Sequence, residues 1–76
     1  MKKLLSECEI GESGSVIKVS GEGRMRRRLF DMGITPTAPF TMKKRAPLGD
    51  PIEITLRGYE LTLRLSEAAC VEVEIQ

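Results

Sequence analysis

Residues 46–65 have the sequence APLGDPIEITLRGYELTLRL and decide the predicted fold. Apolar and polar side chains alternate over residues 52–57 and again over residues 60–65. Alternation with a period of two is typical of a strand that buries one face. Gly58 lies between the two runs at the spacing of a hairpin turn. The stretch therefore predicts a β-hairpin at the centre of a small sheet.

A short turn that contains two prolines precedes this hairpin. Pro47 and Pro51 bracket Leu48, Gly49 and Asp50. Proline fixes φ, and glycine can take dihedral angles that other residues avoid, so the turn is expected to be stiff. One interpretation is that it only sets the register of the following strand. The other is that Leu48, an apolar residue at the tip of a rigid loop, contacts a partner.

Three further segments are expected to be strands: 15–20, 39–45 and 71–75. Residues 1–14 are expected to form an irregular lead, and residues 66–68 have the composition of one helical turn capped by Ser66. The connections between the five strands are short. This pattern predicts a mainly β fold, an antiparallel meander that closes into a small barrel.

One helix is predicted after the first of these strands, over about residues 22–32. Met25, Leu29 and Met32 recur at i, i+4 and i+7 and form a single apolar stripe. Gly33 follows, where a left-handed residue commonly ends a helix. We expect the stripe to cover one open end of the barrel.

The predicted helix also carries four arginines: Arg24, Arg26, Arg27 and Arg28. They could be a solvated face whose side-chain stems pack along the barrel. They could equally dock on an acidic protein surface. Nucleic-acid binding is a third interpretation, which the net charge of +1 and the scarcity of aromatic residues weaken. Phe30 lies off the stripe, so it either covers an edge of the core or contacts a partner.

The length of 76 residues is enough for one domain, residues 1–76, with one small core. Nearly all apolar residues are needed for that core, which leaves little for a deep substrate pocket. No apolar run approaches the roughly 18 to 20 residues that span a bilayer. Leu4 and Leu5 are too short a run for the core of a signal peptide. We therefore expect a cytoplasmic protein that does not insert into the membrane.

Catalytic chemistry has little support in the residue types. The chain has no histidine, so it lacks the serine-histidine and cysteine-histidine pairs of nucleophilic catalysis. Gly21 and Gly23 lack the third glycine and the lysine of phosphate-binding loops. We expect neither a catalytic site nor a bound cofactor.

Metal binding is also weakly indicated. Cys8 and Cys70 are far apart and match no zinc spacing, so we expect reduced thiols, the first in the core and the second partly exposed. Glu7, Glu9 and Glu12 could be imagined as an iron or manganese site. A solvated acidic edge is the alternative, and it is the one we adopt because nothing in the sequence groups these side chains.

An ordered set of short motifs resembles the FeoA family. In order, the motifs are RRLFDMG (27–33), Ile34, Pro36, APLGDPI (46–52), Gly58-Tyr59, Leu63-Arg64 and Glu67-Ala68. The resemblance extends from residue 5 to residue 75. Members of this family are small SH3-like cytosolic proteins of bacterial ferrous-iron uptake, and they act beside a permease that carries a G-protein domain. Thr37 departs from the pattern, because the family usually has glycine there.

The resemblance implies a non-enzymatic accessory protein with an SH3-like fold that docks on the cytosolic part of the ferrous-iron permease. Docking would support or regulate transport, and the residues expected at the contact are Arg27, Phe30, Leu48 and Asp50. The alternative is a metal-responsive sensor or small regulator that binds a transition metal. No nucleic-acid partner is expected, and free strand edges would allow weak self-association.

Overall fold

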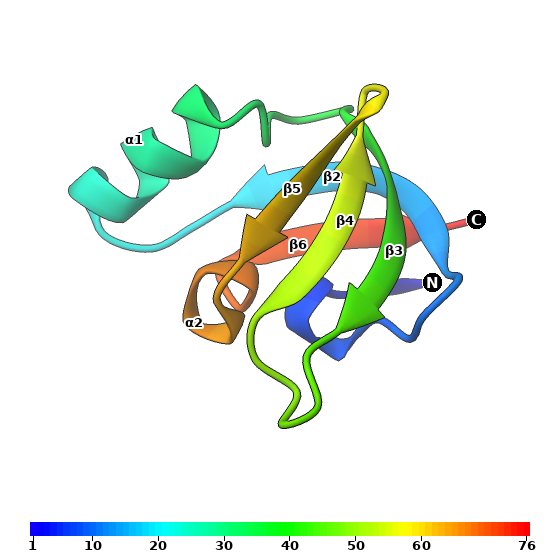
Figure 1. Cartoon of the computed structure of the whole chain (residues 1–76). Coiled ribbons are helices and arrows are strands. Elements are labelled where there is room, and N and C mark those ends of the chain that lie inside the picture. The colour runs from blue at the N-terminus through cyan, green and yellow to red at the C-terminus, as the bar shows by residue number, and fades with distance from the viewer.

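The computed structural model describes residues 1–76, and its largest feature is one sheet of six antiparallel strands (Figure 1). The strands are β1 (Lys2–Leu4), β2 (Ser13–Val19), β3 (Pro39–Arg45), β4 (Ile52–Leu56), β5 (Tyr59–Leu63) and β6 (Val71–Ile75). Three helical segments join them: the 3-10 turn η1 (Leu5–Glu7), helix α1 (Gly23–Asp31) and the single turn α2 (Leu65–Ala68).

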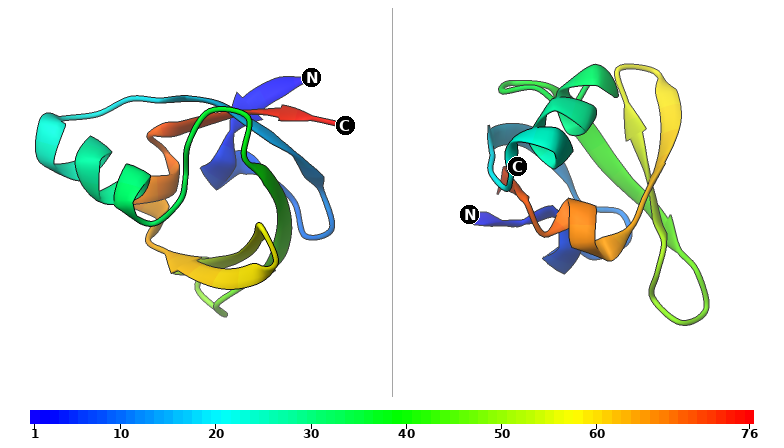
Figure 2. Two further views of the ribbon diagram at one scale, coloured as in Figure 1. Left: turned by 90° about the horizontal axis from the view of Figure 1, so that it is seen from above. Right: turned by 90° about the vertical axis from the view of Figure 1, so that its left-hand side faces the viewer.

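The strands follow the order β1-β6-β2-β3-β4-β5 across one sheet. Strands β2 to β5 form a meander, and β6 returns to pair with β2 on the other side. The sheet curls strongly around its core, as the two additional views show (Figure 2). The mainly β, antiparallel prediction is confirmed. The sheet does not close into a complete barrel, because its end strands β1 and β5 do not pair with each other.

The core lies inside the curl and follows the predicted alternation. On β4, Ile52, Ile54 and Leu56 are almost completely buried, while the two residues between them are half-buried. Leu29 of α1 and Ile34 just after the helix are fully buried. These two side chains connect the helix to the core.

Two local predictions are wrong. Residues 1–14 are not irregular, because β1 pairs with β6 and places Lys3 opposite Val73. The sequence of β1 has too few apolar residues to show a strand pattern, and its partner lies at the other end of the chain. Ser66 is not the cap of α2: Arg64 precedes the helix, and its N–H donates to Oε1 of Glu67 at 3.0 Å.

The predicted hairpin is present as β4 and β5, and its turn has two residues. Leu56 pairs with Tyr59, and the residues between them, Arg57 and Gly58, have φ angles of 51° and 87°. Positive φ at both central residues is typical of a type I′ turn, whose twist matches that of the flanking strands. The turn therefore carries β5 directly back along β4.

Helix α1 ends as predicted and is held at this end by the hairpin. Gly33 has φ of +97°, and the hydroxyl of Tyr59 donates to the carbonyl of Met32 at 2.6 Å. A side chain at position 33 would collide with that hydroxyl. Arg57 adds a second link through Thr35 Oγ1 at 2.9 Å. The other end of α1 projects beyond the sheet (Figures 1 and 2).

Candidate functional site

The four residues expected at a partner contact lie on two separate parts of the fold. Arg27 and Phe30 are on α1, whereas Leu48 and Asp50 are in the turn between β3 and β4. Helix α1 and this turn lie at opposite ends of the molecule (Figure 1; Figure 2, right). The structure therefore does not combine the four residues into one small site.

Leu48 is the most exposed large apolar side chain of the protein, at 95%. The turn that carries it is closed by backbone hydrogen bonds, from the Gly49 N–H to the Ala46 carbonyl and from the Ala46 N–H to the Pro51 carbonyl. The leucine contributes nothing to the core, so its exposure on an ordered turn favours an external contact.

Asp50 and Phe30 have structural contacts of their own. Oδ1 of Asp50 accepts a hydrogen bond from the Leu65 N–H at 3.1 Å, which links the turn to the start of α2. Phe30 is half-buried against the core, and the guanidinium of Arg26 lies 5.0 Å from the centre of its ring. Phe30 therefore covers an edge of the core, as the first of its two interpretations expects.

The largest hollow of the surface lies between α1 and α2, and we call it the α1–α2 groove. Its volume is about 570 Å³. The residues that line it are Gly21, Glu22, Arg24, Met25, Arg28, Glu67 and Cys70. They come from the β2–α1 loop, from both helices and from the residue before β6. No motif or spacing in the sequence indicates this groove, since only the fold brings these segments together.

The groove has a soft apolar wall with charged groups at its rim. Sγ of Cys70 lies 3.5 Å from Sδ of Met25, and these are the two hydrophobic residues of the lining. At the rim, Nε of Arg28 lies 3.5 Å from Oε2 of Glu67. Glu67 is 6% exposed and its other oxygen accepts the Arg64 N–H, so this carboxylate is fully occupied by the fold.

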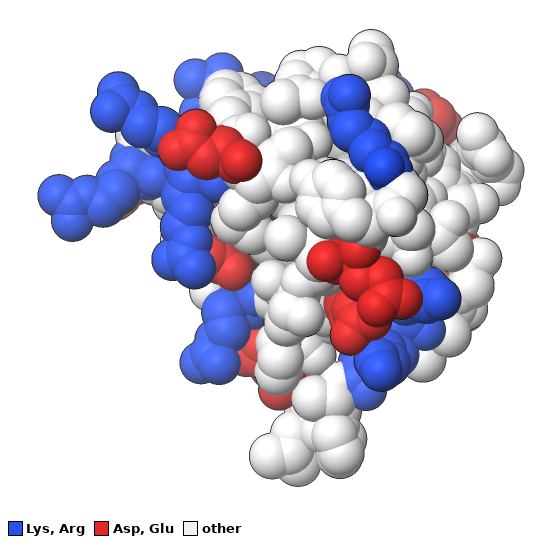
Figure 3. Space-filling view, turned by 45° about the horizontal axis from the view of Figure 1, so that its top comes forward, with Lys and Arg blue, Asp and Glu red and all other residues white.

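The arginines of α1 differ in what they contact. Arg26 donates from Nε to the Val19 carbonyl at 3.1 Å, and Arg28 faces Glu67. The side chains of Arg24 and Arg27 are exposed and make neither a hydrogen bond nor an ion pair. Lys and Arg side chains accordingly gather over the end of the molecule where α1 lies (Figure 3).

Two of the three N-terminal acidic side chains, those of Glu7 and Glu12, are used within the fold. Glu7 accepts the Leu4 N–H at 3.0 Å, and Glu12 accepts the Glu9 N–H at 2.7 Å and pairs with Lys3 Nζ at 3.0 Å. The bond from the Glu9 amide and, next, the Lys3 ammonium lower the pKa of Glu12, and Glu12 raises the pKa of Lys3. No group of three or more Cys, Asp or Glu residues converges in an arrangement that could hold a metal ion.

Both cysteines are free thiols, and their exposures differ as predicted. Cys8 is completely buried, and burial raises its pKa to about 11. Cys70 is half-buried at the wall of the groove. Cys70 is therefore the accessible thiol of the protein.

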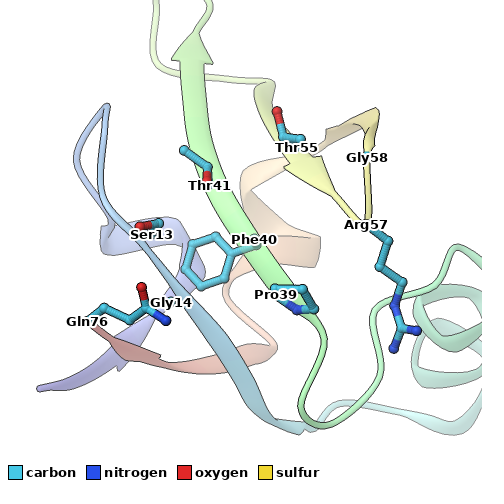
Figure 4. A pocket seen from close by; sticks show the side chains of 9 residues that line it. All are labelled: Ser13, Gly14, Pro39, Phe40, Thr41, Thr55, Arg57, Gly58 and Gln76. Atoms are coloured by element: carbon cyan, nitrogen blue, oxygen red, sulfur yellow. The ribbon is translucent and has the colours of Figure 1, made fainter.

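A second hollow, of about 310 Å³, lies where β2 and β3 meet the β4–β5 turn and the C-terminus (Figure 4). Its polar groups are mainly the hydroxyls of Ser13, Thr41 and Thr55. The Arg57 side chain leads away from it, toward the α1–β3 loop where it binds Thr35 (Figure 4). Phe40 is the one hydrophobic residue among the nine that line this hollow.

None of the helices has both the length and the apolar character that crossing a bilayer requires.

Comparison with known proteins gives a consistent result. The model of the FeoA domain matches residues 3–75. A curated relative from Porphyromonas gingivalis, named as a fusion of Fe(2+) transport protein A with the Fe(2+) transporter FeoB, is 35% identical over 71 residues. The match covers 93% of this chain, but this chain spans only 8% of that relative.

Solved structures similar to this chain carry the same fold. An FeoA-like protein from Clostridium acetobutylicum is 42% identical, with a TM-score of 0.90 over 97% of this chain and 86% of the other. FeoA from Stenotrophomonas maltophilia is 28% identical, with a TM-score of 0.81 over 95% and 89% of the two chains. That structure is a zinc complex, described as a prokaryotic SH3-domain protein and a candidate activating factor of ferrous-iron transport. The SH3-like prediction is confirmed.

Proposed function

The chain belongs to the FeoA family, and from this premise we propose that it is a non-enzymatic accessory protein of bacterial ferrous-iron uptake. In this proposal it docks on the cytosolic part of the iron permease and supports or regulates transport. The observation that carries the proposal is the Porphyromonas gingivalis relative, in which the two proteins are joined in one chain. Such fusion raises the effective concentration of two modules, which is useful when they bind each other.

Two surfaces support docking, at opposite ends of the molecule. Leu48 presents an apolar side chain on an ordered turn, and Arg27 presents a charge that no acidic residue of this chain neutralises. Arginine is enriched among the residues that dominate binding energy, and exposed charges steer association. An exposed apolar side chain such as that of Leu48 is stabilised when a partner removes it from water. Phe30 and Asp50 remain part of the proposed contact, but both also hold the fold together.

The non-enzymatic part of the proposal rests on residue chemistry. The chain has no histidine, and the accessible thiol of Cys70 neighbours a thioether rather than a base. A nucleophile needs an adjacent base or a lowered pKa to react. The chain supplies binding surfaces in place of such a pair.

The test is an amide NMR titration of this protein with the soluble G-protein domain of the permease from the same organism. We expect shifts at residues 46–51 and along α1. Leu48→Asp should weaken binding about tenfold or more, because it places a charge in an apolar contact.

The matched control is Ile10→Asp, which makes the same change at another exposed apolar residue, 62% accessible. It should bind like the unmodified protein, and both variants should keep the amide spectrum of the fold. Equal affinity for Leu48→Asp and Ile10→Asp would remove Leu48 from the contact.

The second candidate function is a metal-responsive sensor or small regulator. It is favoured by one observation, the zinc bound to FeoA from Stenotrophomonas maltophilia. A sensor should bind ferrous iron tightly and in a fixed ratio, which anaerobic calorimetry on the isolated protein measures. Heat no larger than that of the buffer would count against this function and leave docking as the role.

A further inference from the structure

We propose that the α1–α2 groove binds an acidic peptide segment that inserts one apolar side chain between the two helices. The inference rests on the proposed function for the source of that segment, which would be a cytosolic part of the permease. It goes beyond that function by placing the contact at a groove that contains none of the four residues expected from the sequence.

The groove has the size and wall of a side-chain pocket. Ligand pockets have volumes of roughly 300 to 1,000 Å³, and this one is about 570 Å³. Met25 lines it, and an unbranched thioether adapts its shape to different apolar side chains. Gly21 packs closely against the wall, because a Cβ at this position would lie 3.0 Å from Sγ of Cys70. An apolar anchor therefore fits the floor.

The rim supplies positive charge that the fold leaves free. Arg24 has no partner in the structure. Arg28 faces Glu67 through Nε, and its side chain is 70% exposed, so its two terminal nitrogens remain available. The guanidinium fork binds carboxylates through paired hydrogen bonds. Glu67 is already engaged, which leaves Glu22 as the one acidic side chain at the rim without a partner.

The apolar wall and the charged rim together distinguish between possible ligands of the groove. Proteins that bind single-stranded nucleic acid stack its bases on aromatic side chains, and no aromatic residue lines the groove. A free phosphate would use the arginines and leave the apolar floor empty. A peptide with acidic residues on both sides of an apolar one can place the apolar side chain against Met25 and its carboxylates against Arg24 and Arg28. We therefore assign such a peptide as the ligand of the groove.

The chain contains two reporters of groove occupancy. Met25 is one of four methionines, and Met42 is a fully buried control, so methyl NMR of methionine separates the floor of the groove from the core. Cys70 is the accessible thiol, so its rate of reaction with a disulfide reagent measures how well a ligand covers the wall.

The probes are overlapping 15-residue peptides that span the cytosolic parts of the permease from the same organism. A designed peptide, acetyl-EDELFEDE-amide, and its neutral analogue, acetyl-QNQLFQNQ-amide, complete the set. We expect acidic peptides with an apolar residue to shift the Met25 methyl and not that of Met42. At saturation they should slow the Cys70 reaction at least fivefold, and the neutral analogue should bind at least tenfold more weakly.

Two charge-reversal variants test whether the arginine at the rim of the groove binds the peptide. Arg24→Glu should weaken these peptides about tenfold or more, whereas Lys18→Glu, the same change at an exposed residue of β2, should leave affinity unchanged. Equal effects of the two variants would show attraction by net charge alone and overturn the groove as the site.

The outcomes separate this inference from the proposed function. If permease segments bind while Met25 and Cys70 are unaffected, docking stands and the groove proposal is wrong. If no permease segment or domain binds but the designed acidic peptide protects Cys70, the groove proposal stands and the docking function is wrong. If the neutral analogue binds as well as the acidic peptide, or if no peptide reaches the groove, the groove proposal is overturned.

Discussion

Among single residues, Thr37 has the least favourable backbone conformation. Its φ is 74°, in the left-handed region where a β-branched side chain is strained. The position is held there because its N–H donates to the Val16 carbonyl at 2.7 Å. The resemblance to the FeoA family predicts glycine in this turn, and glycine adopts this conformation without strain.

Thr37→Gly should therefore raise the free energy of unfolding, by roughly 1 kcal/mol after the added flexibility of the unfolded chain is subtracted. Urea denaturation measures the change. The control is Thr62→Gly, at an exposed position of β5, which should lower stability because glycine weakens a strand. A loss of stability in both variants would show that Thr37 is not strained.

Glu12 should contribute to the pH dependence of stability. Its folded-state pKa lies below the ordinary value of 4.5, first because of the hydrogen bond from the Glu9 amide and then because of Lys3. Its contribution is thus complete above pH 4.5 and is lost as the pH falls through the lower folded-state pKa. Unfolding measured across this window should show stability rising with pH.

Glu12→Gln should reduce that slope. Lys3→Met should reduce it less, because the bond from the Glu9 amide remains in this variant. If Lys3→Met flattened the slope as much as Glu12→Gln, the ion pair and not the backbone bond would be the main cause of the lowered pKa.

At the level of elements, α1 depends on the hairpin that holds its C-terminal end. Tyr59→Phe keeps the ring and removes the hydroxyl that donates to the Met32 carbonyl at 2.6 Å. We expect a loss of about 1 kcal/mol of stability, the usual contribution of one hydrogen bond. Amide hydrogen exchange should become faster in α1 and stay unchanged in β2 and β3. Unchanged exchange in α1 would mean that Leu29 and Ile34 alone hold the helix.

At the level of the whole molecule, Leu48 on the exposed turn and the α1–α2 groove are separate surfaces, because Leu48 is not among the residues that line the groove. Sites that share no contacts contribute independently to binding, within about 0.5 kcal/mol. Leu48→Asp should therefore leave binding of short peptides to the groove unchanged. Combined with Arg24→Glu, it should lower affinity for the whole permease domain by the sum of the two single effects. A clearly smaller loss of affinity in the double variant would mean that the turn and the groove do not act as separate contacts.

The sequence by itself determined the elements whose signals are local. The period-two runs over 52–57 and 60–65, with Gly58 between them, specify the hairpin. The stripe of Met25, Leu29 and Met32, followed by Gly33, specifies α1. The exposure of Leu48 on its turn follows from the same local signals, as does the separation of a buried Cys8 from an accessible Cys70.

Only the tertiary structure decided the features that join distant segments. Strand β1 exists because it pairs with β6 across nearly the whole chain, and the sheet stays open because β1 and β5 do not meet. The groove is formed by residues from position 21 to position 70 that no spacing relates. Local patterns encode which face of an element is buried, whereas long-range packing decides which faces meet. The division of the expected contact residues between two ends of the molecule is a result of that packing.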